Sequence, residues 1–226
     1  MPTVLITGAN RGLGLEFTKQ YAMEGWQIFA CCRNPSTAKD LAAIKGKISI
    51  HRLDMLDDSQ IRQLSQELSG QAIDVLINNA GVGEFADRLG NIETTKWLSL
   101  LHVNMIAPVH MIENFLPHLE RGQRKLVVNM TSRMGSIEDN HTGGYYLYRS
   151  SKAGLNMVMK SIAIELKPRN IAVILLHPGW VKTAMGGQNA PLSPTESIQH
   201  LRQVIGKVTI HDTGRFFNYD GQTIPW

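Results

Sequence analysis

Cysteine is nearly absent from this chain, and the two cysteines that it has, Cys31 and Cys32, are adjacent. Neighbouring residues of an extended strand point to opposite faces, so these thiols are poorly placed to bridge each other. The sequence therefore excludes a disulfide framework and favours a reducing compartment. The first predicted strand begins at Thr3, which leaves no room for a signal or transit peptide before it. We expect a cytoplasmic location.

Long apolar runs and clustered charges are also lacking. The longest purely aliphatic run extends from Ile171 to Leu176, which is far too short to span a bilayer. The net charge is only +4, and the lysines and arginines are scattered rather than gathered into a basic tract. The pattern predicts binding neither to a membrane nor to nucleic acid. A mildly basic surface does suit a protein with an anionic small-molecule ligand.

Residues spaced as metal ligands are missing as well. No cysteine or histidine pair has the spacing that is typical of a metal site. His102, His110 and His118 recur every eight residues, and eight residues of α-helix turn about 80° beyond two whole turns. We therefore expect the three imidazoles to fan out around their helix, and we predict no metal site.

What the chain does contain is a regular alternation of strand-like and helix-like segments. The seven predicted strands are short, and the central ones are almost continuously apolar, as parallel strands buried on both faces are. They are Thr3–Thr7, Gln27–Cys32, Ile48–Asp54, Asp74–Asn79, Lys125–Ser132, Ile171–His177 and Arg215–Tyr219. Repeated βα units imply a parallel sheet covered by helices on both faces. We predict an α/β fold with a doubly wound parallel sheet, in a single domain over residues 1–226.

Two long helical patterns lie in the second half of the chain. Thr94–Leu119 predicts a helical stretch in which Pro108 is expected to cause a kink or a break. Tyr146–Leu166 predicts another long helix.

A glycine-rich loop follows the first predicted strand and opens the first helix. It reads Thr7-Gly8-Ala9-Asn10-Arg11-Gly12-Leu13-Gly14. Glycines allow a tight turn and the close approach of a pyrophosphate, which the free N–H groups at the positive end of the helix then hold. Taken alone, such a loop could be an ordinary βα turn, but the strand before it and the amphipathic helix after it favour phosphate binding. The pattern predicts a Rossmann-type nucleotide site.

Further motifs follow in order along the chain. They are Asn78-Asn79-Ala80-Gly81 after the fourth strand, Asn104 in the next helical region, Ser132 at the end of the fifth strand, Tyr148-x-x-x-Lys152 in the next long helix, and Pro178-Gly179-Trp180-Val181-x-Thr183 after the sixth strand. Together with the glycine loop, they resemble the short-chain dehydrogenase/reductase family over essentially the whole chain. The segments Tyr148–Ala153, Trp180–Gly187 and Tyr219–Trp226 resemble its sniffer and C-factor branch of carbonyl reductases.

The resemblance implies NADPH-dependent reduction of an aldehyde, a ketone or a quinone, and it gives each motif a role. Tyr148 would be the acid, and Lys152 would be its electrostatic partner and a ligand of the cofactor ribose. Ser132 would hold the carbonyl, and Asn104 would fix a helix kink and a water path to Lys152. The residues implied to contact NADP(H) are Gly8, Asn10, Arg11, Gly12, Leu13, Gly14, Arg33, Asp54, Asn79, Ala80, Gly81, Tyr148, Lys152, Pro178, Gly179, Val181 and Thr183.

The chemistry of the tyrosine and lysine pair supports these roles. A phenol is a weak acid with a pKa near ~10. A cation about 4 Å away, at an effective dielectric constant of about 20, would lower that pKa by roughly three units. Lys152 lies four residues after Tyr148 and shares its helix face, whereas neither Tyr145 nor Tyr146 has a lysine at this spacing.

Purely structural roles remain open for the same residues. Tyr148 and Lys152 could form a surface pair, Ser132 could tie down a turn, and Asn104 could be a buried structural asparagine. Arg11 and Arg33 could be solvated surface residues.

The end of the second predicted strand carries no acidic residue. The family resemblance implies that NAD-specific members hold the ribose hydroxyls with an acid at this place, whereas here it reads Cys31-Cys32-Arg33. Arg33 and Arg11 can both face a 2′-phosphate, which suits the guanidinium fork. We therefore predict that NADPH is preferred over NADH.

Two other functions stay open. A cofactor-sensing or signalling module of the C-factor type would need neither Tyr148 nor Lys152. An epimerase or dehydratase of the same family usually carries a larger C-terminal substrate region, whereas residues 184–226 alone follow Thr183 here.

The sequence also bears on substrate breadth and assembly. The segment from Thr183 to Pro191 is short and rich in small residues, which predicts modest substrate specificity. The family resemblance implies a homodimer or homotetramer that associates through residues 94–119 and 146–166. Apolar side chains that exceed the obvious needs of one core support this interface, with core burial as the alternative; they are Leu98, Leu101, Met105, Met157 and Met159.

Overall fold

A computed structural model describes all of residues 1–226 and contains one seven-stranded sheet. The strands are β1 (Thr3–Thr7), β2 (Gln27–Cys32), β3 (Lys47–Arg52), β4 (Val75–Asn78), β5 (Leu126–Met130), β6 (Ala172–His177) and β7 (Phe216–Asn218). They are ordered β3-β2-β1-β4-β5-β6-β7, and every neighbouring pair is parallel. The prediction of a doubly wound, Rossmann-type parallel sheet is confirmed.

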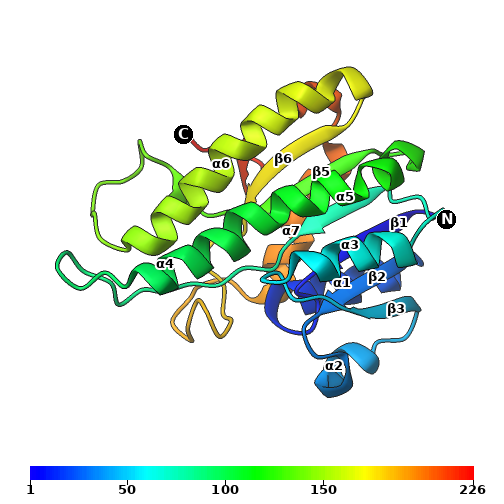
Figure 1. The fold of residues 1–226 in the computed structure, drawn as a ribbon, viewed down its shortest axis with the longest axis horizontal. Helices are drawn as coiled ribbons and strands as arrows, with labels where there is room; N and C mark the ends of the chain where they lie inside the picture. The colour runs from blue at the N-terminus through cyan, green and yellow to red at the C-terminus, as the bar shows by residue number, and fades with distance from the viewer.

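The helices form a layer on each face of the sheet (Figure 1). One layer contains α1 (Gly12–Met23), α2 (Lys39–Ala42) and α7 (Pro194–Lys207), and the other contains α3 (Asp58–Glu67), α4 (Thr94–Leu101), α5 (Ala107–Arg121) and α6 (Tyr146–Leu166). Short 3₁₀ turns span Pro35–Thr37, Arg133–Gly135, Lys167–Arg169 and Ile210–Asp212. No helix combines the length and the apolar character that crossing a membrane requires.

Each helix layer encloses its own apolar core against the sheet. Successive strand residues alternate between the two cores, as the two-residue period of a strand requires: Val4 and Ile6 pack beneath α1, while Leu5 packs beneath α5. Cys31 and Cys32 separate in the same way, one in each core, and both thiols are free. The expectation that they do not bridge each other is confirmed.

Five strands are shorter at one or both ends than their apolar runs predict. The residues that extend beyond them still make backbone hydrogen bonds: Leu53 N–H donates to the Cys32 carbonyl, and Thr131 N–H donates to the Leu176 carbonyl. Leu53 and Thr131 lie outside the regular ladder but remain buried. Ser132 therefore follows β5 instead of ending it.

The long helical stretch breaks before the predicted proline. A π-helical turn, His102–Ile106, separates α4 from α5, and Pro108 is simply the second residue of α5. The interruption is therefore centred on Asn104, and Pro108 occupies a first-turn position that tolerates proline.

The same π turn overturns the expectation for the histidines. Because a π turn contains one extra residue, it rotates the following helix back by about 100°. His102 Nε2 and His110 Nδ1 consequently converge on Asp58 Oδ1, at 3.2 and 2.9 Å. His118 is buried elsewhere, with Nε2 3.1 Å from the Leu68 carbonyl oxygen.

Candidate active site

The glycine loop and the segment after β4 are fixed to each other at the carboxyl edge of the sheet. Thr7 Oγ1 accepts hydrogen bonds from the backbone N–H groups of Asn79 (3.0 Å) and Ala80 (2.9 Å). The Asn79 side-chain amide donates to the carbonyl oxygens of Thr7 (2.9 Å) and Gly8 (3.3 Å). This crevice lies between β1 and β4, where the strand order changes direction and where open α/β sheets bind ligands.

The backbone of the glycine loop approaches its surroundings too closely for side chains. A Cβ on Gly14 would lie 2.1 Å from the Gly8 carbonyl oxygen, and Gly8 itself has φ of +66°. Gly12 has φ of +54° and faces the Thr183 side chain. No side chain caps α1, so its first-turn N–H groups are open to an anion. The loop therefore fits a dinucleotide pyrophosphate.

Both predicted phosphate-binding arginines lie exposed on this edge. Ala9 N–H donates to the Cys31 carbonyl (2.9 Å), which holds the glycine loop beside the end of β2 and the following Arg33. Neither Arg11 nor Arg33 forms an ion pair or a side-chain hydrogen bond, so both guanidinium groups could contact an added phosphate. Asp54 is half-buried after β3, and its carboxylate accepts from Leu56 N–H (3.0 Å).

The segment after β6 closes the other side of the crevice. Gly179 has φ of +81°, and a Cβ there would lie 2.5 Å from Leu192. The Pro178 carbonyl accepts from Ser197 in α7, and Val181 is buried. The remaining predicted cofactor residues of the glycine loop, Asn10 and Leu13, are half-buried.

Three of the predicted catalytic residues meet between β5 and α6. Tyr148 is the third residue of α6 and Lys152 lies one turn later, while Ser132 follows β5. All three are buried. Ser132 Oγ accepts a hydrogen bond from Met134 N–H (3.1 Å) and caps the Arg133–Gly135 turn, and its hydroxyl also interacts with the Tyr148 side chain.

Two neighbouring hydroxyls that could compete with Ser132 are engaged elsewhere. Thr131 Oγ1 donates to Asn156 Oδ1 (2.7 Å), and Ser136 Oγ donates to the Trp226 carbonyl oxygen (3.1 Å). Ser132 is therefore the hydroxyl of this segment that lies against Tyr148.

The prediction that Lys152 lowers the pKa of Tyr148 is wrong for this structure. Burial raises the pKa of Tyr148 to about 12, although the Ser132 side chain opposes the rise. Lys152 Nζ donates to the Met130 carbonyl (2.9 Å) and lies 5.8 Å from the centre of the Tyr148 ring. Loss of hydration also lowers the pKa of Lys152 to about 8. Desolvation thus outweighs the attraction that the i, i+4 spacing suggests.

Asn104 lies in the π turn and clamps the loop that follows β4. Its Oδ1 accepts from Val82 N–H (2.9 Å), and its Nδ2 donates to the Val82 carbonyl (2.9 Å) and to Ser151 Oγ (3.0 Å). A Cβ on Gly81 would lie 3.4 Å from Asn104 Oδ1 and 3.7 Å from Lys152 Nζ. Asn104 therefore joins this loop to α6 beside the lysine.

Sequence reasoning missed the loop between Val82 and Glu93. Phe85 of this loop packs on Tyr148, with ring centres 5.1 Å apart, and on Tyr145, at 6.0 Å. A Cβ on Gly83 would lie 3.6 Å from Met185, so this loop also approaches the segment after β6. The aromatic wall of the site therefore comes from here. A phenylalanine shortly after the Asn-Asn-Ala-Gly motif was the available signal.

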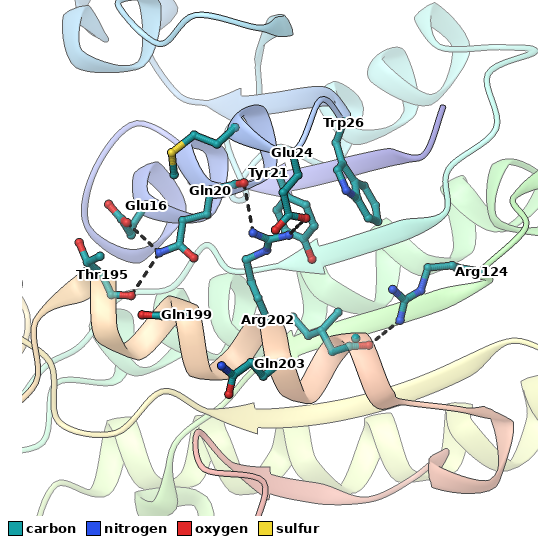
Figure 2. A pocket seen from close by; sticks show the side chains of 13 residues that line it. Glu16, Gln20, Tyr21, Glu24, Trp26, Arg124, Thr195, Gln199, Arg202 and Gln203 are labelled. Carbon is teal, nitrogen blue, oxygen red and sulfur yellow. Dashed lines mark hydrogen bonds and ion pairs between the residues drawn. The ribbon is translucent and has the colours of Figure 1, made fainter.

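A surface hollow lies elsewhere, between α1 and α7 (Figure 2). Its volume is about 590 Å³, and it contains none of the predicted site residues. Its polar side chains mostly bind one another or nearby backbone: Gln20 binds Glu16 and Thr195, and Arg202 binds Glu24. The candidate active site is therefore the crevice at the carboxyl ends of β1, β4, β5 and β6.

Curated relatives match much or all of this chain. C-signal of Myxococcus xanthus is 41% identical over 154 residues, which are 68% of this chain and 93% of C-signal. The 1-hydroxy-2-glutathionyl-2-methyl-3-butene dehydrogenase of Rhodococcus sp. is 32% identical over 232 residues and is matched along the full length of both chains.

Solved structures match the whole fold. Carbonyl reductase Sniffer of D. melanogaster superposes with a TM-score of 0.92 at 35% identity, covering all of both chains. The NADPH-bound carbonyl reductase from chicken fatty liver also has a TM-score of 0.92, at 30% identity, and covers 100% of this chain and 99% of that one. A sequence model described as short chain dehydrogenase matches residues 2–192. The chain thus belongs to the short-chain dehydrogenase/reductase family and resembles its Sniffer-like carbonyl reductases.

Proposed function

We propose that this protein is an NADPH-dependent reductase of aldehydes, ketones or quinones. The observation that carries the proposal is the meeting of Ser132, Tyr148 and Lys152 beside a glycine loop that fits a pyrophosphate. The NADPH-bound carbonyl reductase of the same fold supports the choice of cofactor and of reaction.

Residues of the chain would bind, orient and protonate the substrate carbonyl oxygen. Bound NADPH supplies the hydride. The Ser132 hydroxyl, which lies beside the Tyr148 phenol, would donate to the carbonyl oxygen and orient it. Tyr148 has its pKa raised to about 12 and is protonated at neutral pH, which is the form that gives a proton to the developing oxyanion.

Lys152 and Asn104 would support these two groups. The buried ammonium of Lys152 would bind the cofactor ribose and stabilise negative charge near the phenol. Asn104 holds the helix break and the loop beside the lysine, and a water path through this region would return a proton to Tyr148. The glycine loop, Asn79–Gly81 and Pro178–Thr183 hold the remaining parts of NADPH, with Asp54 near the adenine.

We propose modest substrate specificity. The segment from Thr183 to Pro191 offers few fixed side chains, and the edge-to-face rings of Phe85 and Tyr145 provide an aromatic wall with few hydrogen-bonding groups. Selection by one methylene is worth only about 1–3 kcal/mol in such a pocket.

The proposal is tested by NADPH oxidation against a panel of aldehydes, ketones and quinones. We expect comparable kcat/KM for several members, and a Tyr148→Phe variant that binds NADPH but has no turnover. Lys152→Met should weaken both turnover and NADPH binding. A wild-type rate in Tyr148→Phe would refute the mechanism. One substrate preferred by about four orders of magnitude would instead indicate a dedicated hydrogen-bonding site.

A second candidate is a signalling or cofactor-sensing role, which the similarity to C-signal favours. Such a role requires NADPH binding but not turnover. Restoration of function in a C-signal-deficient host by Tyr148→Phe as well as by the wild type would favour it.

We further propose that the protein forms a homodimer or homotetramer. Leu98 of α4 and Met157 of α6 are 61% and 68% exposed, which leaves an apolar face on the outer side of these helices. Leu101 and Met105 are half-buried, whereas Met159 is fully buried and belongs to the core. The expectation that Met159 contributes to an interface is therefore wrong.

A further inference from the structure

Resting on the proposed role of Tyr148 as the acid, we propose that Asp87 is the residue that positions it. Asp87 lies in the loop between β4 and α4 and is only 5% exposed. Its Oδ2 accepts a hydrogen bond from the backbone N–H of Leu147, at 3.3 Å. Leu147 is the second residue of α6 and directly precedes Tyr148.

The local sequence gives α6 no N-terminal cap of its own. Tyr145, the residue before the helix, has φ of +54° and makes no side-chain hydrogen bond to the first turn. The first N–H groups of a helix have no partner within the helix, and a carboxylate is stabilised beside them. Asp87 therefore supplies, from sixty residues earlier in the chain, the acceptor that the helix lacks.

The Asp87 carboxylate has no other partner that would explain its burial. Its Oδ1 is buried without a hydrogen bond. A buried carboxylate that makes a single hydrogen bond is costly. The N-terminus of α6 therefore offsets part of the cost of burying Asp87. The same hydrogen bond links the loop of Asp87 to the first turn of α6, which carries Tyr148.

The same loop holds the tyrosine ring as well as its backbone. Phe85, two residues before Asp87, packs on the Tyr148 ring, and the Arg88 guanidinium lies 5.5 Å from the centre of the Tyr145 ring. Lys152 lies one turn further along α6, and the Met130 carbonyl holds it independently. Loss of Asp87 should therefore displace Tyr148 more than Lys152.

The test compares Asp87→Ala with Asp87→Asn, and with Glu84→Ala as the matched control. Glu84 belongs to the same loop, but its carboxylate accepts only from Ala86 N–H (3.1 Å) and does not contact α6. For Asp87→Ala we expect kcat to fall at least tenfold while the Kd for NADPH stays within twofold of wild type. Asp87→Asn keeps an acceptor for Leu147 without the charge, and we expect about a threefold loss. Glu84→Ala should behave as wild type.

Amide hydrogen exchange at Leu147 gives a readout that is independent of turnover. We expect faster exchange there in Asp87→Ala, a smaller increase in Asp87→Asn, and none in Glu84→Ala. Unchanged kcat and exchange in Asp87→Ala would overturn the proposal, as would an equal loss of kcat and NADPH affinity. If Asp87→Ala does not fold, unchanged kcat and exchange in Asp87→Asn would overturn it. Tyr148→Phe is measured in parallel to separate a failure of the Asp87 proposal from a failure of the proposed function. Full turnover in Tyr148→Phe would show that Tyr148 is not the acid.

Discussion

At the scale of single residues, side chains of the site make a structural hydrogen bond and still have capacity for a further one. Ser132 uses its oxygen to cap a turn while its hydroxyl lies against Tyr148. Lys152 donates one proton to the Met130 carbonyl, which leaves two others. The structural alternatives considered for these residues are thus partly realised, and they are compatible with the catalytic roles that we propose.

Arg33 is the residue on which the choice between NADPH and NADH should depend. The side chain is exposed and unpaired, at the end of a strand that carries no acid. Arg33→Asp should lower the ratio of kcat/KM for NADPH to that for NADH by about 10- to 100-fold, because a hydrogen bond to a charged group contributes about 1.5–3 kcal/mol. Arg62→Asp, at an exposed position of α3, is the control. An unchanged ratio in Arg33→Asp would show that another group reads the 2′-phosphate.

His177 should make the protein sensitive to acid. Burial lowers the pKa of His177 to about 4 from an ordinary value of 6.5, and the charge of Arg133 adds to the shift. Between these two pH values, the unfolded chain binds a proton here that the folded chain does not, so the free energy of unfolding falls as the pH falls. The contribution is at most about 3 kcal/mol; it is fully present above pH 6.5 and lost by about pH 4.

His177→Asn removes this titration. Urea unfolding of the variant at a series of pH values should show a flatter dependence between pH 6.5 and about 4 than the wild type does. His141→Asn, at an exposed position, should keep the wild-type dependence. Identical slopes for His177→Asn and the wild type would mean that other groups cause the acid sensitivity.

At the scale of elements, the π turn between α4 and α5 connects the core to the site. It places Asn104 so that one side chain makes three hydrogen bonds, two to Val82 and one to Ser151. A regular helix would rotate the residues that follow away from their present partners. The single extra residue thus determines both the clamp on the loop and the pairing of His102 with His110 at Asp58.

Asn104→Ala should therefore cost stability as well as activity. The variant removes three hydrogen bonds, two to half-buried Val82 and one to buried Ser151, and we expect the free energy of unfolding to fall by about 2–4 kcal/mol in urea titrations. Asn114→Ala, which removes one hydrogen bond to the His110 carbonyl on the same helical stretch, should cost less than about 1 kcal/mol. Equal losses of unfolding free energy in the two variants would show that Asn104 does not hold the loop at Val82 to α6.

Sequence alone predicts the helices, strands and site residues that are determined by residues close together in the chain. The strands follow from continuous apolar runs, and α6 has the predicted bounds of Tyr146–Leu166. Tyr148 and Lys152 could be singled out because their spacing follows the family motif, and Ser132 because it follows the fifth strand as the family serine does, although its interval to Tyr148 is a few residues longer than usual. The π turn has no periodic signature, and the contacts of Phe85 and Asp87 join segments far apart in sequence. The lowered pKa of Lys152 likewise depends on burial that no spacing reveals.

At the scale of the whole molecule, the exposed apolar face of α4 and α6 should determine the assembly. We expect the wild type to be a dimer or tetramer in light scattering, and the double variant Leu98→Glu and Met157→Glu to be monomeric, because it buries charge at the interface. Met23→Glu, which changes an exposed methionine of α1 in the opposite layer, should leave the assembly unchanged. A monomeric wild type at micromolar concentration would remove the proposal.

The separation of the two cysteines gives this protein a built-in kinetic probe for each layer. Cys31 and Cys32 are 0% and 2% exposed and belong to different cores, so a thiol reagent reaches each one only when its layer opens. With mass spectrometry that resolves the two sites, equal labelling rates in dilute urea would mean that both layers open as one cooperative unit. Faster labelling of Cys32 would show that the α1, α2 and α7 layer detaches first, and faster labelling of Cys31 would show that the layer containing α3, α4, α5 and α6 does.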